Sequence, residues 1–532
     1  MSESQPKNST EAFERLFQNF EERPEETEAY IQGIIPQWIN GTLLRNGPGM
    51  YSVGQDTYNH WFDGMALLQR FRIENGKVKC NTKYLRSDTY KRNIAANRIV
   101  VSEFGTMGHP DPCKTLFNRY FSYFFDSQFT DNDLVNFGLS GDEVYACTEG
   151  PIINFVDKTN LDVIRQEDLS KVIAVNTATA HPHYDAAGNS YNLGTTKHGY
   201  CLIKVPNPKN TGNPGLLGAK IVAHIPKCHR INQSYFHSFG MSEHYAVLPE
   251  MSLILNVPKL MASWYHIWSG NFSECIEWHP EFKPIFHIVN LETGEPISVR
   301  YTTTQPFFVF HHINTFERDN CLFVDVCLFD SGDVVFSFNL SNFRSTLFNS
   351  DQSNASKPVP TRFILPLTIP NNVQPGQDLL LSYGIQSNAT AVVQQDGSVE
   401  ISGEKLTNDA CFEFPRINYE HVNGRPYRYC YGTGTQEFHR LGASLIKLDI
   451  ETRSVSKYLV QGDRCIAGEP VFVPKPNGSS EDDGVCLVPV IDVHTTANDY
   501  ILVLDAKSWQ ELGRAIVDPR LPMSFHAQFL NE

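Results

Sequence analysis

The sequence lacks several features that would place it in a broad class at once. Its formal net charge is −15 and it has no long run of Lys or Arg, so nucleic acid is not expected as a partner. No uninterrupted apolar stretch approaches the ~20 residues that a membrane-spanning helix requires. The first residues, MSESQPKNSTEAFERLF, lack the charged-then-apolar pattern of a secretion signal. We therefore expect a cytoplasmic protein that is not secreted.

The cysteines show no paired metal-binding spacing, although there are twelve of them. In an intracellular protein they are expected to be reduced thiols rather than disulfides. The chain of 532 residues is 41% hydrophobic, 12% aromatic and 19% charged. This composition supplies a large apolar core and excludes a disordered chain.

Short apolar runs separated by turns rich in Gly, Asn, Asp and Pro begin at Gly41 and predict an all-β fold. Five segments share one design, in which an apolar strand meets an Asp or Asn, a polar turn follows, and a second strand begins. These segments are 71–78, 153–163, 286–297, 445–455 and 502–512. Recurrent hairpins of this kind are typical of the outer strands of propeller blades, although any β protein contains some.

The domain organisation is predicted to be simple. Residues 1–35 are expected to form a short helix and a linker, because EAFERLFQNFEE has helical spacing and Pro24 interrupts it. Residues 36–532 are expected to form a single domain, because no Pro/Ser-rich linker divides them. Three segments interrupt the β pattern: an aromatic one predicted to be helical, an apolar one with few charges, and one rich in Asn, Ser and Pro that is predicted to be a loop insertion. They are 110–125, which lies within an expected dome insertion at 107–125, and then 251–272, also a dome insertion, and 345–378.

Four histidines, far apart in the chain, each lie in a short apolar or aromatic strand-like stretch. They are His181 in ATAHPHYD, His237 in SYFHSFG, His311 in FVFHHIN and His526 in MSFHAQF. Histidine loses solvation in such a place and needs a partner. A single case is more often a hydrogen-bonded core residue, but four together favour side chains that converge on one metal ion.

Two neighbouring histidines leave alternatives open. Alternate residues of a strand share a face, so His181 and His183 are also compatible with a local zinc clamp. His311 and His312 are adjacent and point to opposite faces of a strand, so only one of them can face a common centre.

Three glutamates lie in equally apolar contexts. They are Glu149 in YACTEGP, Glu413 in CFEFPRI and Glu469 in IAGEPVFVP. Four neutral imidazoles leave the charge of a buried cation unbalanced, and metal-bound histidines commonly donate their second N–H to a carboxylate. Three histidine–glutamate pairs around one ion would meet both requirements. The alternative for each glutamate is an exposed or backbone-bonded residue near a strand end.

An ordered set of motifs resembles the carotenoid cleavage oxygenase family, most of all its animal branch. The motifs run in family order from about residue 35 to the C-terminus: RNGPG, NHWFDGMALL, NRIVVSEFGT, PDPCK, TAHPHYD, YFHSFG, FHHINTFE, FEFPRINY, EPVFVP and EDDG. The resemblance implies an all-β, seven-bladed β-propeller with a helical and loop dome over its metal-containing top face. It implies Fe(II) held by His181, His237, His311 and His526, with Glu149, Glu413 and Glu469 behind them. His183 and His312 match positions that are not ligands.

The resemblance also implies an activity. A non-haem iron dioxygenase would cleave a double bond of a carotenoid with O₂ and release apocarotenoid or retinal aldehydes. Central 15,15′ cleavage is expected, and a coupled trans-to-cis isomerisation is left open. The alternatives within the family are eccentric 9′,10′ cleavage and a retinoid isomerohydrolase. A β-propeller interaction module without catalysis is the alternative from another class.

Substrate and membrane contacts follow from the same resemblance. The expected substrate-binding residues are Phe104, Val135, Thr148, Tyr235 and Phe329, with ordinary packing as the alternative for each. Because carotenoids reside in bilayers, we expect peripheral, monotopic membrane association through 107–125 and 251–272. Cys113 in PDPCK is the candidate lipidation site. The sequence does not indicate an oligomeric state.

Overall fold

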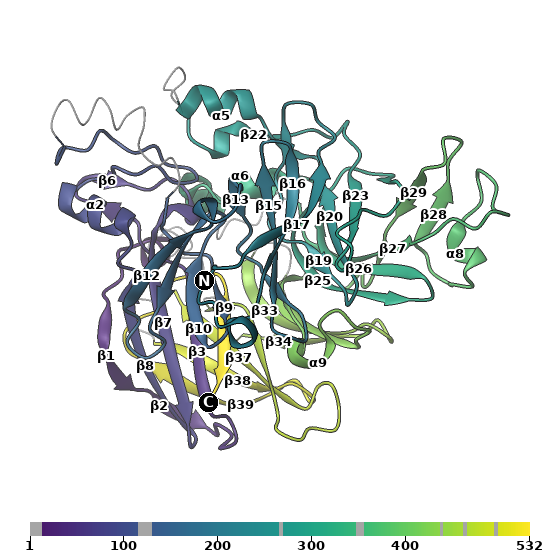
Figure 1. The fold of residues 1–532 in the computed structure, drawn as a ribbon. Coiled ribbons are helices and arrows are strands. Elements are labelled where there is room, and N and C mark those ends of the chain that lie inside the picture. Colours follow the sequence, from purple (N-terminus) through teal and green to yellow (C-terminus); the bar gives the residue numbers. More distant parts are fainter. Residues whose placement is uncertain are drawn as a thin grey trace, which may run out of the picture.

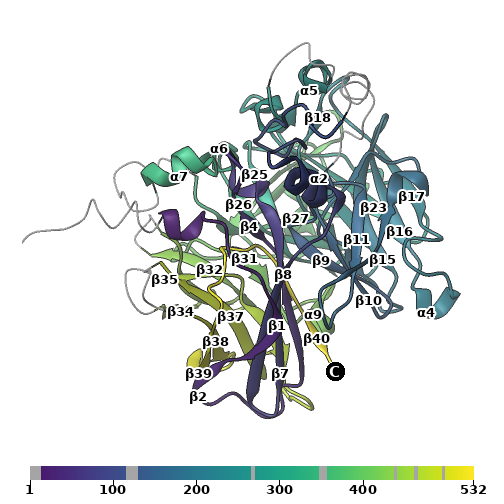
Figure 2. The same cartoon turned by 90° about the vertical axis from the view of Figure 1, so that its left-hand side faces the viewer.

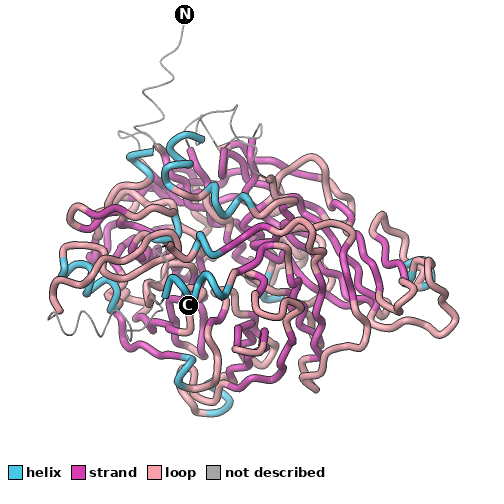
Figure 3. Tube along the Cα trace, turned by 90° about the horizontal axis from the view of Figure 1, so that it is seen from above, coloured by secondary structure: helices cyan, strands magenta, loops and turns pink. Residues whose placement is uncertain are grey.

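The described part of this computed structural model consists mostly of β-strands (Figure 1). It covers residues 13–114, 130–264, 270–346, 356–436, 440–460, 465–493 and 498–532. Seven sheets with four or more strands make up most of it. Their pairings are antiparallel, apart from the parallel pairing of β24 (Tyr301–Thr303) with β29 (Val399–Ser402). The all-β prediction is confirmed for the described residues, whose trace in Figure 3 shows many strands and few helices.

Two sheets join the beginning of the chain to its end. In the first sheet the C-terminal strand pairs with an early strand, and Arg45 lies opposite Ala527. This sheet contains β1 (Arg23–Glu28), β8 (Lys77–Tyr84), β7 (Met65–Glu74), β3 (Gly41–Arg45), β40 (Ala527–Asn531) and β4 (Pro48–Met50). The last sheet contains β2 (Tyr30–Gly33), β39 (Gln510–Val517), β38 (Asp499–Asp505), β37 (Gly484–Asp492), β35 (Cys465–Ala467) and β36 (Val471–Pro474). Early and late segments therefore lie side by side (Figures 1 and 2).

Five further sheets follow one another along the chain between these two. The second contains β9 (Asn136–Ser140), β10 (Glu143–Cys147), β11 (Ile152–Val156) and β12 (Val163–Asp168), and the third contains β13 (Thr177–Ala178), β14 (His183–Tyr184), β15 (Ser190–Thr196), β16 (Gly199–Val205) and β17 (Lys220–Pro226). The fourth contains β19 (Gly240–Met241), β20 (Tyr245–Glu250), β23 (Ile285–Asn290), β24, β29 and β28 (Thr390–Val393). The fifth contains β25 (Phe308–Arg318), β26 (Cys321–Phe329), β27 (Val359–Pro366) and β30 (Glu404–Lys405), and the sixth contains β31 (Glu413–Arg416), β32 (Tyr429–Gln436), β33 (Arg440–Asp449) and β34 (Val455–Leu459). Smaller pairings join β18 (Gln233–Ser234), β21 (Leu253–Leu255) and β22 (Ile276–Trp278), and also β5 (Ser52–Val53) with β6 (Asp56–Thr57).

The core lies on both faces of the middle strands. All residues of β37 except the last are buried, and β26 is buried along nearly its whole length. Strands packed on both faces need apolar residues at successive positions, as GVCLVPVID supplies in β37. The outer strands β12 and β34 contain exposed residues instead. The second and sixth sheets therefore run from the buried interior to a solvent-exposed outer strand.

Helices are short, and several of them gather at one end of the sheets. Figure 2 shows α2, α5, α6 and α7 on the upper side of the molecule, while α4 and α9 lie lower. The α-helices are α2 (Asp88–Ala96), α4 (Pro208–Thr211), α5 (Val257–Trp264), α6 (Asp333–Ser337), α7 (Leu340–Thr346), α8 (Leu379–Ser382) and α9 (Tyr419–Val422). Short 3-10 helices are η1 (Trp61–Asp63), η2 (Leu169–Lys171) and η3 (Ser273–Cys275).

The predicted hairpin segments lie where strands turn back on their neighbours. Four of them connect paired strands: β7 with β8, β11 with β12, β33 with β34, and β38 with β39. In the fifth, Val289 of β23 forms a bridge with Pro296 across the turn. The prediction that these five segments form hairpins is confirmed.

Two expectations about loops need correction. The stretch 345–378 was expected to be an insertion without strands, but β27 (Val359–Pro366) lies within it and pairs along its length with β26. Its sequence VPTRFILP is mostly buried. The polar residues that precede it hid this strand in the sequence pattern. Part of the expected linker forms strands β1 and β2 at sheet edges, where most residues are exposed and no hydrophobic alternation marks them. The domain boundary at residue 36 stays a prediction.

The two other insertions are described only in part. The predicted helix within 107–125 falls mostly on residues 115–129, outside the described residues. Within 251–272 the structure has β21 and α5, and residues 265–269 again lie outside the description.

Candidate metal centre

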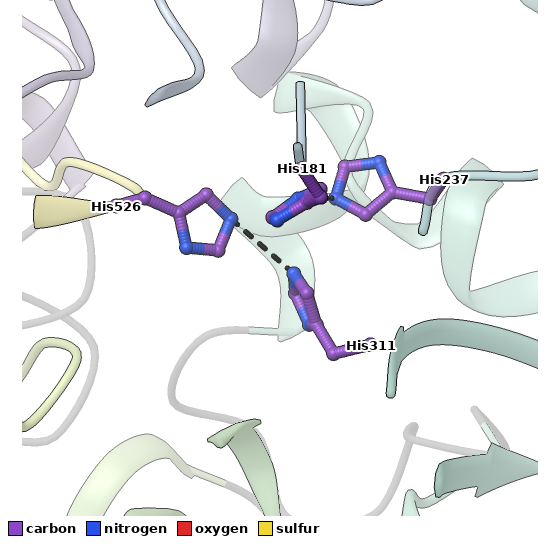
Figure 4. Close-up of side chains that lie close together, drawn as sticks. All are labelled: His181, His237, His311 and His526. Carbon is purple, nitrogen blue, oxygen red and sulfur yellow. Dashed lines mark hydrogen bonds between the residues drawn. The ribbon is translucent and has the colours of Figure 1, made fainter. Parts of the chain in front are cut away.

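Four histidine side chains meet at one point in the interior (Figure 4). They are His181, His237, His311 and His526, and each offers a ring nitrogen within 4.8 Å of the others. The Nε2 atoms of His181 and His237 are 2.9 Å apart, and those of His311 and His526 are 3.2 Å apart. The predicted convergence of four distant segments is present in the fold. His183 and His312 are not members of the group.

Each histidine comes from a different sheet or from the segment beside it. His181 lies between β13 and β14, His237 lies before β19, His311 lies in β25, and His526 directly precedes β40. The register of β25 shifts between Val309 and His312, which is a bulge in the pairing with β26. Bulges re-aim side chains, and this one turns His311 toward the group. The His526 backbone N–H donates to the Val135 carbonyl at 3.3 Å, which ties the last segment to the second sheet.

Three of the four imidazoles form hydrogen bonds to carboxylates. The Nδ1 atom of His237 bonds Glu149, that of His311 bonds Glu413 at 2.5 Å, and that of His526 bonds Glu469 at 2.9 Å. Because a carboxylate accepts, each Nδ1 is the donor, and the ring is held with its Nε2 lone pair toward the group. Within the described residues, no carboxylate bonds to His181. Its backbone N–H instead donates to the Thr179 hydroxyl at 3.1 Å.

The electrostatics keep the rings neutral and a carboxylate charged. Burial lowers the pKa of His526 to about 4, although Glu469 acts in the opposite direction. Burial, together with the neighbouring imidazoles, lowers the pKa of His181 well below its usual range. Burial raises the pKa of Glu469, but Arg416 and His526 more than offset this and hold it at about 2. Neutral imidazole is the form that ligates a metal, so these two rings are in the binding form at neutral pH.

The donor set fits a metal ion. His311 and His526 both use Nδ1 as the donor, so their two Nε2 lone pairs face each other at 3.2 Å without a proton to share. A proton there would make one ring a cation, which the lowered pKa of His526 opposes. A metal cation satisfies both lone pairs at once, and imidazole nitrogen suits iron, copper, nickel and zinc alike. Four such donors around one point can therefore hold a first-row transition metal.

The histidines outside the group have structural partners. His183 bonds the Phe239 carbonyl and the Tyr419 hydroxyl, each at 3.1 Å. His312 bonds the Ser238 hydroxyl at 2.8 Å. The alternative of a local zinc clamp formed by His181 and His183 is wrong, because the His181 ring contacts His237 whereas the His183 ring bonds Phe239 and Tyr419.

Two of the expected substrate-binding residues contact the metal-binding group or its carboxylates. The Tyr235 hydroxyl bonds both oxygens of Glu149, at 3.0 and 2.9 Å. Val135 contacts the group through its carbonyl, which accepts the His526 N–H bond. Thr148 is partly buried and directly precedes Glu149 in the chain.

Phe104 and Phe329 belong to a chain of aromatic rings that leads away from the group. Phe310 lies against His237, with ring centroids 5.3 Å apart, and Phe329 packs on Phe310 at 5.9 Å. Phe62 links Phe310 to Phe104, at 6.4 and 5.5 Å. The rings form a continuous apolar wall that begins at the histidines.

Two residues next to Glu413 were not singled out in the sequence. Phe414 packs its ring on His311 and His526, at 5.5 and 5.4 Å, and adopts a left-handed backbone with φ of 51°. Its N–H donates to Glu413 at 2.6 Å. Arg416 donates to Glu469 at 2.8 Å and to the Ala527 carbonyl. The motif FEFPRINY contains both residues, but only the fold reveals which neighbours they contact.

The described residues also bear on membrane contact. No helix among them is both long and apolar enough to cross a bilayer. Cys113 is exposed and lies just before the first undescribed internal stretch.

Known proteins resemble this chain over nearly its whole length. A sequence model of the family described as "Retinal pigment epithelial membrane protein" matches residues 16–531. "Carotenoid-cleaving dioxygenase, mitochondrial" of Mustela putorius furo is 41% identical over 97% of this chain and 96% of its own. "Beta,beta-carotene 15,15'-dioxygenase" of Homo sapiens is 39% identical over 97% of this chain and 94% of its own. A solved structure of Synechocystis apocarotenoid oxygenase, a Glu150Asp mutant, matches the fold with a TM-score of 0.77 at 22% identity, over 98% of this chain and 99% of that one. The chain therefore belongs to the retinal pigment epithelial membrane protein family, which is the carotenoid cleavage oxygenase family that its motifs resemble.

Proposed function

We propose that this protein is an Fe(II)-dependent dioxygenase that cleaves a carotenoid with O₂. The main support for the proposal is that four imidazoles from different parts of the fold direct ring nitrogens toward one point. Three of these imidazoles also form hydrogen bonds to carboxylates. His181, His237, His311 and His526 would hold the iron, and Glu149, Glu413 and Glu469 would orient three of these rings and offset its charge. The names of the relatives, which are carotenoid dioxygenases at 39–41% identity, support the substrate class.

The seven larger sheets serve in this proposal as the blades of one β-propeller. The joining of early and late strands in two sheets supports a closed ring. The helices at the upper side, with segments 107–125 and 251–272, would form a dome over the metal. Residues 36–532 would make up this single catalytic domain.

The donor set explains why iron suits the reaction. Fe(II) held by His181, His237, His311 and His526 would supply the electrons that activate O₂, which zinc would not. The aromatic rings from Phe310 to Phe104 would exclude water and would hold an apolar polyene beside the histidines. His237, His311 and His526 are buried and His181 is partly buried, which would keep competing solvent away from the reacting bond.

Tyr235 and Val135, two of the proposed substrate-binding residues, also contact the metal-binding group or its carboxylates. Tyr235 would keep Glu149 in place through its hydroxyl, and its ring stacks on Phe308 with the centroids 6.1 Å apart. Val135 would crowd one open coordination position; its carbonyl accepts the His526 N–H bond, which places its backbone beside the four histidines. Thr148 and Phe329 would complete the substrate contacts.

Iron content and oxygen-18 labelling test the reaction. The purified protein should contain a single iron per chain and convert β-carotene under air to aldehydes that carry oxygen from ¹⁸O₂. A product oxygen derived from water would reject the dioxygenase and favour a hydrolytic relative acting on retinyl esters. A well-folded protein without iron would favour the non-catalytic propeller.

Central 15,15′ cleavage is the proposed position, with coupled trans-to-cis isomerisation as a further step to test. Identities of 41% and 39% to the two kinds of relative do not separate the positions. Chromatography of the products decides: central cleavage of β-carotene gives two retinal molecules, whereas eccentric cleavage gives two aldehydes of different length. The geometry of the retinal reports the isomerisation.

The protein is also proposed to be cytoplasmic and to associate with membranes from one side. The apolar α5, the exposed Cys113 and the bilayer location of carotenoids support this. Flotation with lipid vesicles tests it, with a Cys113→Ser variant separating lipidation from the contribution of the apolar surface. Recovery of all the protein in the lipid-free fraction would reject it.

A further inference from the structure

A second group of metal-ligating side chains lies away from the four-histidine centre. The thiol of Cys228, a carboxylate oxygen of Glu250 and a ring nitrogen of His287 all lie within 4.8 Å of one another. Cys228 lies in the loop after β17, in the third sheet, whereas Glu250 ends β20 and His287 lies in β23, both in the fourth. The group therefore bridges two neighbouring sheets.

The strand register explains how the two strand residues meet. In the antiparallel pair of β20 and β23, Leu248 lies opposite His287 and Glu250 lies opposite Ile285. Residues two apart on a strand share a face, so Glu250 and His287 are diagonal neighbours on one face of the pair. Their side chains make contact, with His287 Nε2 2.8 Å from Glu250 Oε2.

Glu250 is built into this place before any metal binds. It is fully buried, and its oxygens accept the Cys228 backbone N–H at 3.0 and 3.1 Å and the Tyr200 hydroxyl at 3.2 Å. Its Oε2 also accepts a hydrogen bond from His287 Nε2, so the buried carboxylate is held in position by Cys228, Tyr200 and His287. A buried, charged carboxylate is rare and needs cationic or hydrogen-bonding company.

The three donors match one class of cation. Thiolate, carboxylate and imidazole together supply two negative charges, which neutralise a divalent ion at a site that bridges two sheets. Cysteine, histidine and glutamate are the ligands of zinc, and three protein ligands leave a fourth tetrahedral position for water. Cys228 is exposed, so a metal can reach the site from solvent.

We propose that Cys228, Glu250 and His287 form a second metal site, which takes Zn²⁺ or another thiophilic divalent cation. The bound ion connects the loop after β17 to the paired strands β20 and β23. The site is independent of the reaction at the four histidines.

Metal binding would convert the Cys228 thiol into a thiolate. A coordinated metal displaces the thiol proton outright, and the thiolate supplies one of the two negative charges of the site.

Cobalt titration of the iron-loaded protein tests the site, because Co²⁺ bound by a thiolate absorbs in the near ultraviolet and Co²⁺ bound only by imidazoles lacks that band. We expect a single additional equivalent of Co²⁺ with the thiolate band, and its displacement by Zn²⁺. Cys228→Ser should abolish the band, and His287→Gln should weaken the binding at least ~10-fold. Cys113→Ser, at another exposed cysteine, is the matched control and should keep the band.

Thermal unfolding provides a second readout. Because an ion that binds only the folded state stabilises it, Zn²⁺ should raise the midpoint of the wild type and of Cys113→Ser but not of Cys228→Ser. All variants should keep one iron at the centre, which shows that they fold. No thiolate band in the wild type, or an equal band in Cys228→Ser, would overturn the proposal and leave Glu250 and His287 as a plain hydrogen-bonded pair.

Discussion

His526 at the candidate metal centre and His60 beside the aromatic wall are both buried histidines, and burial lowers the pKa of each to about 4. Their ring nitrogens have different partners. His526 donates from Nδ1 to Glu469 and leaves Nε2 facing His311. His60 accepts the Phe62 N–H at Nδ1, 3.1 Å away, so its Nε2 carries the proton and donates to the Val335 carbonyl at 3.0 Å.

The two rings show what separates a candidate ligand from a core histidine. Neither burial nor a low pKa distinguishes them, because both follow from desolvation alone. A ring whose two nitrogens are both satisfied by protein groups has no lone pair to give to a metal. A ring whose Nδ1 is fixed by a carboxylate, with Nε2 turned toward other imidazoles, has one. Substitutions at paired positions can test this distinction.

The largest effect is expected from replacing the histidine with the free lone pair. His526→Asn should lose the bound iron and reduce carotenoid cleavage at least ~100-fold, since loss of a ligand exceeds the 10–100-fold effect of losing a ligand's support. His60→Asn should keep a full iron content, because asparagine can still cap the Phe62 N–H. Elemental analysis of folded protein checks both. Equal iron loss in the two variants would show that the nitrogen partners do not define the ligand.

The carboxylates behind the ligands should matter next, and unequally. Glu413→Gln should weaken iron binding roughly 10-fold, and Glu469→Gln closer to 100-fold. The difference arises because Glu469 also pairs with Arg416 and accepts the Ala527 N–H at 2.9 Å. Removing its charge leaves a guanidinium beside the metal site without its counter-charge. Chelator competition measures both affinities, and a larger loss in Glu413→Gln would contradict the ranking.

The pH dependence of the folding free energy should report on His60 and Asp63, two buried groups in the same turn. His60 has a folded pKa of about 4 against 6.5 unfolded, so its stabilising effect is lost as pH falls below 6.5. Asp63, in the same turn, has its pKa raised by burial to about 6 against 3.8, so acidification through pH 6 relieves a destabilising charge. The two effects oppose each other between pH 7 and pH 5.

Single variants should therefore separate the two slopes. On going from pH 7 to pH 5, Asp63→Asn should lose about 1 kcal/mol more folding free energy than the wild type. His60→Asn should gain about 2 kcal/mol relative to the wild type over the same interval. Denaturant unfolding at the two pH values measures the slopes, whatever the absolute stability of each variant. Slopes of the same sign would show that these two groups do not govern the turn.

The four converging histidines could be predicted from the sequence for a physical reason, but the partners of their ring nitrogens could not. A histidine among apolar strand residues is an unsatisfied polar group, so His181, His237, His311 and His526 stood out wherever they lay. His60 has no such signal, because NHWFDG is a mixed stretch at a helix start. The partner of each nitrogen depends on which segments meet across the fold, and this is invisible in a single chain.

The same limit applies to the strands and to the supporting residues. The middle strands were predictable because burial on one or both faces imposes apolar runs. The edge strands β1 and β2 were not, because exposed residues with no alternation can pair through their backbone alone. The bulge that turns His311 inward, the ring of Phe414 and the pairing of Arg416 depend on three-dimensional register rather than on local composition.

The smallest effect is expected at Glu149, the carboxylate most open to solvent. Its side chain is 27% exposed, against 12% for Glu413 and 3% for Glu469. Tyr235→Phe removes the hydroxyl that bonds both of its oxygens, but water can replace a donor at an exposed carboxylate. We expect iron affinity to fall only a few-fold, in line with a net hydrogen-bond contribution of about 1 kcal/mol. A loss as large as that of Glu469→Gln, measured by the same chelator competition, would mean that His237 depends on the tyrosine as much as on its carboxylate.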